Sequence, residues 1–211
     1  MGELSGIPNS RRLDKSFYLD SDVTGMARRL LGKYLVTRIN GLVSSGMIVE
    51  TEAYRGPDDK ACHAYQNKKT PRTKPMFEAG GIAYVYLCYG IHHLFNVVSG
   101  PEGMAHAVLI RAIAPADNVE LMLQRRKHKR VSPKLSAGPG VLSSALGITT
   151  ALNGQSLTSP DSPIWLEDRG HFLPEADIIS TTRIGVAYAG DCAFREWRFF
   201  IKDNPWISKP A

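Results

Sequence analysis

The dipeptide Asn40-Gly41 stands between two apolar stretches and constrains the fold more than any other feature of this sequence. Asn and Gly tolerate the positive φ angles that a two-residue hairpin turn needs, so the pair predicts a turn between two antiparallel strands, at residues 34–39 and 42–53. The other predicted strands lie at 82–87 and 94–98, with a turn at Gly90 between them, and at 107–113, 164–167, 183–187 and 198–201.

Helices are predicted at three places. Residues 22–31 carry apolar side chains at helical spacing and end at Gly32, a residue type that commonly closes a helix. Residues 116–129 suggest an amphipathic helix, and residues 141–146 suggest a short one. Because strands dominate and their connections are short, we expect a mixed α/β fold of the α+β type, with a largely antiparallel sheet and a few flanking helices. The length of 211 residues fits one domain or a tightly fused pair.

Composition excludes several classes of protein. Hydrophobic residues make up 43% of the chain and charged residues 22%, which excludes a largely disordered protein. The 26 Lys and Arg residues exceed the 20 Asp and Glu residues, and the net charge of +6 suits a polyanionic partner, although this signal is weak on its own. The three cysteines are far apart, so they predict neither a disulfide framework nor a metal knuckle.

No secretory signal or membrane-spanning segment is expected. Residues 1–9 lack the apolar core of a signal peptide. Residues 79–101 carry no formal charge, but glycines, two adjacent histidines and an asparagine interrupt the stretch, which indicates buried strands with a turn. The sequence therefore predicts a soluble protein in a reducing compartment.

The stretch 46–54 places two carboxylates on one predicted strand. Side chains alternate between the two faces of a strand, so Ile48, Glu50, Glu52 and Tyr54 are expected on one face and their neighbours on the core side. An unpaired buried carboxylate is costly. Either both glutamates are solvated or salt-bridged at the surface, which spacing alone favours, or one of them activates a water molecule with the other in support.

Three tyrosines form a second group. Tyr84 and Tyr86 share one face of a predicted strand, where tyrosines usually serve packing. Tyr89 precedes Gly90 at the expected turn, where its ring is not needed for packing. In a basic protein, an aromatic side chain displayed in this way can wedge between nucleic-acid bases and stack on them.

Basic residues gather at 68–74 and at 125–134. Flexible lysines explain the first cluster alone and a solvated helix end explains the second, but together the two favour a face that binds phosphates. No HExxH motif, cysteine cluster, GxSxG motif or Walker loop occurs, so we expect neither a catalytic metal nor a cofactor.

A set of short motifs recurs in a fixed order along the chain, from about residue 12 to residue 208. The motifs are Ile48-Val-Glu-Thr-Glu-Ala-Tyr54, Gly56-Pro-Asp58, His63, Thr70-Pro-Arg72, Met76-Phe77, Tyr84-Val-Tyr86, Tyr89-Gly90, Asn96, Leu109-Ile-Arg111, Ser136-Ala-Gly-Pro139, Arg183-Ile-Gly185, Ala189-Gly190 and Asn204-Pro-Trp206. With these motifs the sequence closely resembles the alkyladenine (3-methyladenine) DNA glycosylase family. The ordered set is highly specific, although no single motif would be.

The resemblance implies roles for individual residues. Glu52 resembles the general base that activates water for attack on the sugar C1′, and Arg111 resembles its catalytic partner. Tyr89 resembles the wedge that fills the gap left in the duplex. The implied pocket for an extruded base consists of Tyr54, Ala61, His63, Tyr86, Asn96 and Ile184, with Asn96 limiting the entry of guanine. Expected contacts to the DNA backbone come from Lys68, Lys69, Arg72, Lys74 and Gly90.

The resemblance also implies the overall organisation. A single glycosylase domain is expected at 12–208, after a flexible segment at 1–11, with a curved antiparallel sheet and a protruding β-hairpin. Its implied partner is double-stranded DNA with damaged purines, without a cofactor, a metal or a membrane, and we expect a monomer. A bacterial protein would act in the cytoplasm at the nucleoid, whereas a nuclear or organellar site stays open for a eukaryotic one.

The implied activity is that of a monofunctional DNA repair glycosylase. Such an enzyme flips damaged purines (the 3-methyladenine, 7-methylguanine, hypoxanthine and ethenoadenine class) out of duplex DNA, hydrolyses the N-glycosidic bond and leaves an abasic site. Glu50 is expected to support the fold or the electrostatics of Glu52. Two other functions stay open from the residues: a non-catalytic nucleic-acid-binding module, and an N-glycosidase acting on free nucleosides or ADP-ribose.

Two positions depart from the family's pattern. Where some relatives carry a lysine after Ser-Gly-Pro, this chain has Gly140, which puts a DNA contact there in doubt. His92 replaces an aromatic residue that some relatives carry beside the wedge. We expect the second change to alter the surface of the hairpin.

Overall fold

Asn40 and Gly41 adopt φ angles of 53° and 77°, and they turn one long strand back on another as their sequence predicts. The computed structural model describes residues 11–208. Within these residues, the strands are β1 (Arg11–Arg12), β2 (Tyr34–Ile39), β3 (Leu42–Arg55), β4 (Ala83–Cys88), β5 (His92–Ser99), β6 (His106–Asp117), β7 (Ile164–Asp168), β8 (Ile178–Thr181) and β9 (Arg198–Ile201).

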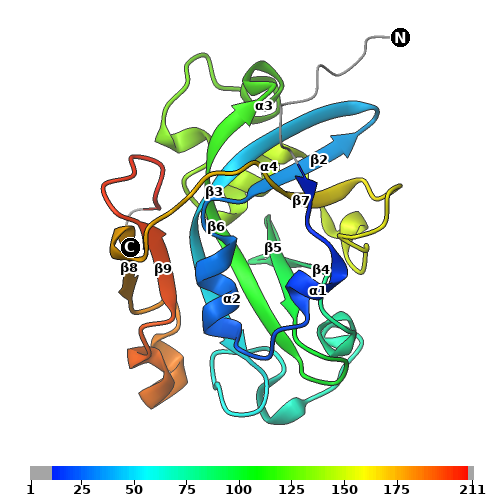
Figure 1. The fold of residues 1–211 in the computed structure, drawn as a ribbon, viewed down its shortest axis with the longest axis vertical. Coiled ribbons are helices and arrows are strands. Elements are labelled where there is room, and N and C mark those ends of the chain that lie inside the picture. The colour runs from blue at the N-terminus through cyan, green and yellow to red at the C-terminus, as the bar shows by residue number, and fades with distance from the viewer. Residues whose placement is uncertain (1–10, 209–211) are drawn as a thin grey trace.

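The described strands form one open sheet of nine strands, and every pairing in it is antiparallel (Figure 1). The order across the sheet is β1-β7-β2-β3-β6-β5-β4. Strand β9 pairs with β3 as well, and β8 pairs with β9. The mixed α/β fold with one large antiparallel sheet is therefore confirmed.

Strand β3 lies in the middle of the sheet and pairs with three other strands, and its two halves have different neighbours. Its first half pairs with β2, and residues 50–52 pair with β9, while β6 follows its other edge along most of its length. The register against β6 shifts at three places, once between Ser45 and Gly46 and twice around Glu50: Ile48 faces Ile113 and Glu50 faces Ala112, but Thr51 faces Ile110. Each shift is a β-bulge, a device that re-aims side chains.

The bulges change the predicted alternation along β3. Ile48 belongs to the main hydrophobic core together with Ala53, rather than lying on the face of Glu50 and Glu52. The expectation that Ile48 shares a face with the two glutamates was wrong, because the shift between Ile48 and Glu50 leaves Val49 as an extra residue between them. Tyr54 does lie with Glu52, since its hydroxyl donates to that carboxylate.

Helices α1 (Lys15–Tyr18), α2 (Val23–Leu30), α3 (Val119–Arg126) and α4 (Pro139–Leu146) pack around the sheet, and α2 lies against it in Figure 1. Asp22 caps α2, because its carboxylate accepts from the N–H of Thr24 at 3.0 Å. Short 3₁₀ segments occur at Tyr65–Asn67, Lys74–Phe77, Pro133–Leu135, Thr150–Leu152, Glu175–Asp177 and Ala187–Phe194.

One continuous core joins the sheet to the helices. Met26 and Leu30 of α2 pack with Phe95 and Ile110 of the sheet and with Leu142 of α4, and each of these side chains is fully buried. Burying a side chain of this size contributes about 1.5–3 kcal/mol. The core therefore holds β3, β5 and β6 as a rigid platform for the face of β3 that carries the two glutamates.

Two predicted elements differ from those of the structure. The strand predicted at 183–187 is absent: Gly185 has a φ of 75°, which an extended strand does not allow, and β8 lies earlier, at Ile178–Thr181. The helix predicted from residue 116 begins at Val119, because β6 continues to Asp117. Residues 1–10 of the expected flexible segment lie outside the described residues, while Arg11 pairs with Asp168.

Within residues 11–208, we find no helix with the length and apolar character needed to cross a lipid bilayer.

Candidate active site

A cavity of about 580 Å³ opens beside the ends of β3 and β4. Its wall combines side chains from β3, β4, β5, β6, the loop after β3 and the segment after β8. The residues of the wall that the sequence predicted are Tyr54, Ala61, His63, Arg72, Tyr86, Tyr89, Asn96, Arg111 and Ile184. The structure thus brings together the predicted base-binding residues, Tyr89 and Arg111, although they span 131 positions of the sequence, from 54 to 184 inclusive.

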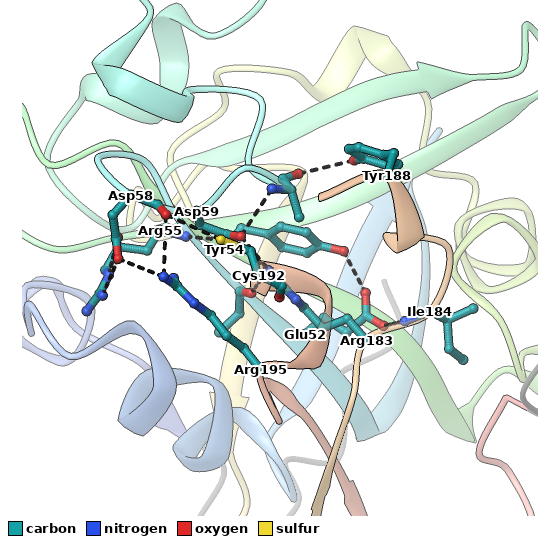
Figure 2. Close-up of polar contacts among 12 residues, drawn as sticks. Glu52, Tyr54, Arg55, Asp58, Asp59, Arg183, Ile184, Tyr188, Cys192 and Arg195 are labelled. Carbon is teal, nitrogen blue, oxygen red and sulfur yellow. Dashed lines mark hydrogen bonds and ion pairs between the residues drawn. The ribbon is translucent and has the colours of Figure 1, made fainter. Parts of the chain in front are cut away.

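Glu52 lies directly behind this wall. It is fully buried and is not itself a wall residue. Its Oε1 accepts from the backbone N–H of Ile184 at 2.8 Å, and its Oε2 accepts from the hydroxyl of Tyr54 at 2.7 Å (Figure 2). The same Oε1 lies 3.3 Å from Nη1 of Arg111. All three partners line the cavity. A carboxylate has about four acceptor positions, and three are occupied by these partners, so one position on Oε2 has no partner among residues 11–208.

Tyr54 is held as a hydrogen-bond donor. Burial raises the pKa of its hydroxyl well above the ordinary value, and the neighbouring Glu52 carboxylate raises it further. The phenol therefore stays protonated and donates to Glu52. The guanidinium of Arg183 lies 4.8 Å from the centre of the Tyr54 ring, on one face of it.

Arg111 bridges the two carboxylates of β3. It occupies the second of the two bulges around Glu50, where the register passes from Ala112 opposite Glu50 to Ile110 opposite Thr51. From this position its Nε donates to Glu50 at 3.1 Å, and its Nη1 reaches Glu52. Burial lowers the pKa of Arg111, but the carboxylates of Glu52 and Glu50 outweigh it, so the pKa is raised overall. The guanidinium of Arg111 therefore stays positively charged.

Glu50 has a more crowded environment than Glu52. Its Oε1 accepts from Arg111, from Nε of Arg198 at 2.7 Å and from the hydroxyl of Ser208 at 2.7 Å, and its Oε2 accepts from the Ser208 N–H at 2.5 Å. Neither glutamate lies at the surface, so the interpretation of two solvated or surface-paired acids was wrong. The two bulges around Glu50 and the pairing with β9 bury both acids.

Part of the cavity wall is a cluster of aromatic side chains. The ring centres of His63 and Tyr86 are 4.6 Å apart, and those of Tyr84 and Tyr86 are 5.5 Å apart. His63 Nδ1 lies 2.9 Å from the Tyr84 hydroxyl. Burial, helped by the nearby Arg72, lowers the pKa of His63 to about 4, so the ring is neutral near pH 7. Burial raises the pKa of Tyr84 to about 12.

Arg72, which was predicted to contact the DNA backbone, lies at the cavity. Its Nη2 is 3.2 Å from Nε2 of His63, and its guanidinium carbon lies 5.0 Å from the centre of the Tyr86 ring. Because Arg72 can only donate, His63 accepts at Nε2 and carries its proton on Nδ1, toward Tyr84. The other predicted backbone residues of this loop, Lys68, Lys69 and Lys74, are exposed away from the cavity wall.

Tyr89 stands at the tip of the β4–β5 hairpin. It is 91% exposed and adopts a φ of 50°, and Gly90 follows with a φ of 72°. An exposed aromatic ring on such a tight turn is held out from the protein body rather than packed into it. The structure thus bears out the predicted turn and the display of Tyr89.

Asn96 forms a fixed part of the floor of the cavity. It is buried on β5, and its side-chain amide nitrogen donates to the carbonyl oxygens of Tyr84 at 3.1 Å and Leu94 at 3.4 Å. Both amide hydrogens are used in this way, so the amide cannot turn freely, and only its carbonyl oxygen is left as an acceptor.

The two departures from the family's pattern contact each other. A Cβ atom built on Gly140, at the start of α4, would lie 2.9 Å from Cγ and from Nδ1 of His92 and 3.0 Å from its Cβ. His92 begins β5, directly after the hairpin tip. The imidazole therefore rests on the bare backbone of Gly140.

The second basic cluster serves the fold in part. Nη1 of Arg125 donates to the carbonyl oxygen of Ala145 at 3.1 Å and to the Ser44 hydroxyl at 2.9 Å, which caps the last turn of α4. Nη2 of Arg126 donates to the carbonyl oxygen of Lys134 at 3.3 Å. Arg125 thus ties α3 to α4, and Arg126 ties α3 to the short segment Pro133–Leu135.

Sequence reasoning missed several residues of the site. Asp59 and Arg183 form a buried ion pair behind Tyr54, and Tyr188, 72% exposed, lies on the rim of the cavity. Arg183 stood in a recognised motif but carried no assigned role. Nothing in the local spacing points to Asp59 as its partner, because the two residues are 124 positions apart.

Two comparisons with known proteins bear on this site. A family model described as methylpurine-DNA glycosylase (MPG) matches residues 16–205. A Chlamydia felis protein with the provisional name 3-methyladenine DNA glycosylase is 50% identical over 191 residues, which cover 90% of this chain and 95% of that protein. A Bacillus cereus protein with the same provisional name is 44% identical over 200 residues, or 92% of this chain and 97% of that protein.

Proposed function

This chain belongs to the methylpurine-DNA glycosylase family and is a monofunctional DNA glycosylase, and from that premise we propose that it flips damaged purines into the cavity and hydrolyses their N-glycosidic bond with a water molecule oriented by Glu52. The proposed substrates are purines of the 3-methyladenine, 7-methylguanine, hypoxanthine and ethenoadenine class in duplex DNA. The observation that carries this proposal is the buried Glu52 carboxylate, bound by three residues that all line an aromatic cavity.

The size and chemistry of the cavity suit a purine. Its volume of about 580 Å³ falls within the range of about 300–1,000 Å³ that is usual for small-molecule sites. Tyr54 and Tyr86 offer aromatic faces, which attract a cationic alkylated base by about 0.5–2 kcal/mol. Asn96, fixed by its two hydrogen bonds, supports the proposed steric limit on the exocyclic amino group of guanine.

Arg72 lies over the ring of Tyr86, where an entering base would stack. We infer that the base displaces the guanidinium. Released from His63, this long exposed side chain is free to reach a phosphate, together with Lys68, Lys69 and Lys74 of the same loop and the backbone at Gly90. The predicted contacts to the DNA backbone remain part of this proposal.

Flipping a nucleotide out of a duplex costs a few kcal/mol. We propose that Tyr89 offsets part of this cost by entering the gap, since stacking on a base contributes about 1–3 kcal/mol. Its exposure at the hairpin tip favours this role. We also propose that the protein acts as a monomer.

The hydrolytic step requires one proton acceptor and one water molecule. The water oxygen bonds to C1′ as the bond from C1′ to the base nitrogen breaks, and the electron pair of that bond leaves with the base. Glu52 accepts the water proton at the available position on Oε2, while Arg111 and the Ile184 N–H hold Oε1. Within the described residues of the cavity wall, no lysine is present to attack the sugar, in keeping with a monofunctional reaction.

A single-turnover excision assay tests the proposal. We expect the wild-type chain to release hypoxanthine from duplex DNA containing inosine. Glu52→Gln should slow release by about 10²–10⁴-fold and retain affinity for the lesion duplex, because the amide cannot accept the water proton but the cavity wall is unchanged. Glu102→Gln, at an exposed glutamate, is the control and should match wild type.

Two results would contradict this proposal. If Glu52→Gln excised the base at the wild-type rate, the carboxylate would not be the base of the reaction. If the wild-type chain bound the duplex but left every modified purine in place, the chain would act as a nucleic-acid-binding module instead.

A further inference from the structure

Two ion pairs join the same two segments of the chain. The loop after β3, residues 56–63, supplies Asp58 and Asp59, and the segment from 183 to 195 supplies Arg195 and Arg183 (Figure 2). The Asp58–Arg195 pair lies at the surface, with 43% and 27% of the side chains exposed. The Asp59–Arg183 pair is completely buried. The two pairs therefore share topology but differ in burial and in neighbours.

The guanidinium of Arg183 holds three segments together. Its Nη1 donates to Oδ2 of Asp59 at 2.5 Å and to the carbonyl oxygen of Ala53 at 2.8 Å. Its Nη2 donates to Oδ1 of Asp59 at 2.8 Å and to the carbonyl oxygen of Cys192 at 3.1 Å. Such a two-pronged pair fixes direction as well as distance, and only the planar guanidinium provides it.

Each of these contacts lies next to a partner of Glu52. Ala53 separates Glu52 from Tyr54 on β3, and the Arg183 guanidinium covers one face of the Tyr54 ring. The residue after Arg183 is Ile184, whose N–H donates to Glu52 Oε1. Two of the three donors that hold the Glu52 carboxylate are thus fixed through one side chain.

Asp59, the partner of Arg183, also binds a residue of the cavity wall. Its Oδ1 accepts from the N–H of Ala61 at 3.1 Å, and the hydroxyl of Tyr188 donates to the Ala61 carbonyl oxygen at 3.4 Å. Burial lowers the pKa of Arg183, but Asp59 outweighs it and the pKa is raised overall, so the pair stays charged. A buried ion pair of this kind contributes little net stability and acts mainly on geometry.

We propose that Arg183, anchored by Asp59, is a positioning residue for base excision, which fixes the Tyr54 hydroxyl and the Ile184 N–H on the Glu52 carboxylate. This inference rests on the proposed role of Glu52. It assigns Arg183 no contact with the substrate. A displacement of about 1 Å in a catalytic group can slow a reaction by about 10²-fold. Loss of the two-pronged pairing between Arg183 and Asp59, called the fork below, should therefore lower the rate of bond cleavage.

The test compares the same conservative change in the two pairs. Arg183→Lys keeps the positive charge but removes the fork, and Arg195→Lys makes that change in the surface pair. With inosine-containing duplex and saturating enzyme, we expect Arg183→Lys to lower the single-turnover rate of excision by about 10–100-fold, while the Kd for the duplex changes less than about threefold. Arg195→Lys should stay within about threefold of wild type in both quantities.

Different outcomes would overturn the positioning role of Arg183 and the proposed excision function. An Arg183→Lys rate equal to that of Arg195→Lys, or a loss confined to Kd, would overturn the positioning role. Absence of excision by the wild-type chain would instead overturn the proposed function. If Arg183→Lys melts below the assay temperature, Asp59→Glu replaces it, with Asp58→Glu as its control. That change retains both charges and moves the fork by one methylene group, and the same loss of rate is expected.

Discussion

Glu50 and Glu52 lie two residues apart on β3 and share Arg111, yet the remaining partners of the two carboxylates differ in kind. Glu50 binds a second buried arginine, Arg198, and both the backbone and the hydroxyl of Ser208. Glu52 binds Tyr54 and Ile184, which line the cavity. Burial alone therefore does not distinguish Glu50 from Glu52, the carboxylate that we propose as the base, whereas the nature of their partners does.

The largest effect on stability should come from Glu50→Gln. The amide retains the size of the carboxylate but removes the charge that two buried arginines share, and its NH₂ group cannot accept from Ser208. We expect a loss of about 3–5 kcal/mol in the free energy of unfolding, measured by urea denaturation. Glu52→Gln should cost less, because Arg111 keeps Glu50 as its partner. Equal losses of unfolding free energy in Glu50→Gln and Glu52→Gln would show that the two carboxylates do not differ in their structural role.

A smaller effect should separate the two arginines that bind Glu50. Arg111 reaches both carboxylates, whereas Arg198 reaches only Glu50. We expect Arg111→Lys to slow single-turnover excision about 10–100-fold more than Arg198→Lys, since lysine cannot bridge both acids with one planar group. Thermal melting of both variants controls for stability. Similar rates in the two variants would show that Glu52 does not depend on the shared arginine.

The smallest effect should appear in acid and concerns the cavity alone. The pKa of His63 is about 4 in the folded protein, against 6.5 for a free histidine side chain. Between these values the unfolded chain binds more protons than the folded chain, so the contribution of His63 to stability is full above pH 6.5 and falls as the pH drops toward 4. The guanidinium of Arg72, 3.2 Å from Nε2 of His63, also lowers the pKa of His63 and favours its neutral ring.

Urea denaturation at pH 7, 5.5 and 4.5 measures this effect against His63→Gln. The difference in unfolding free energy between wild type and the variant should shift steadily against wild type as the pH falls. A difference that is independent of pH, or that shifts in favour of wild type, would contradict a neutral buried His63.

Much of the fold could be predicted because its signals are local. The Asn40-Gly41 turn, the capped helix α2 and the exposed Tyr89 at a hairpin tip each depend on a few neighbouring residues, and the structure contains all three. The cavity wall could be predicted only from the ordered motifs of a family, since its residues come from distant parts of the chain.

The rest depends on register and on long-range pairing. Regular alternation placed Ile48 with the two glutamates, but the bulge at Val49 reversed its direction. Spacing cannot reveal such bulges, because nothing in the local sequence marks them. The partner of Arg183 is 124 positions away, and Ser208 is 158 positions from Glu50. Arg72 also shows that a basic loop residue can turn toward a ring rather than toward solvent.

The contact between His92 and Gly140 couples evolutionary change at these two positions. Any side chain gained at position 140 meets the imidazole, which must then shift, whereas a smaller residue at 92 leaves room for it. A cation at this position of α4 is therefore accommodated more easily once position 92 carries a smaller residue.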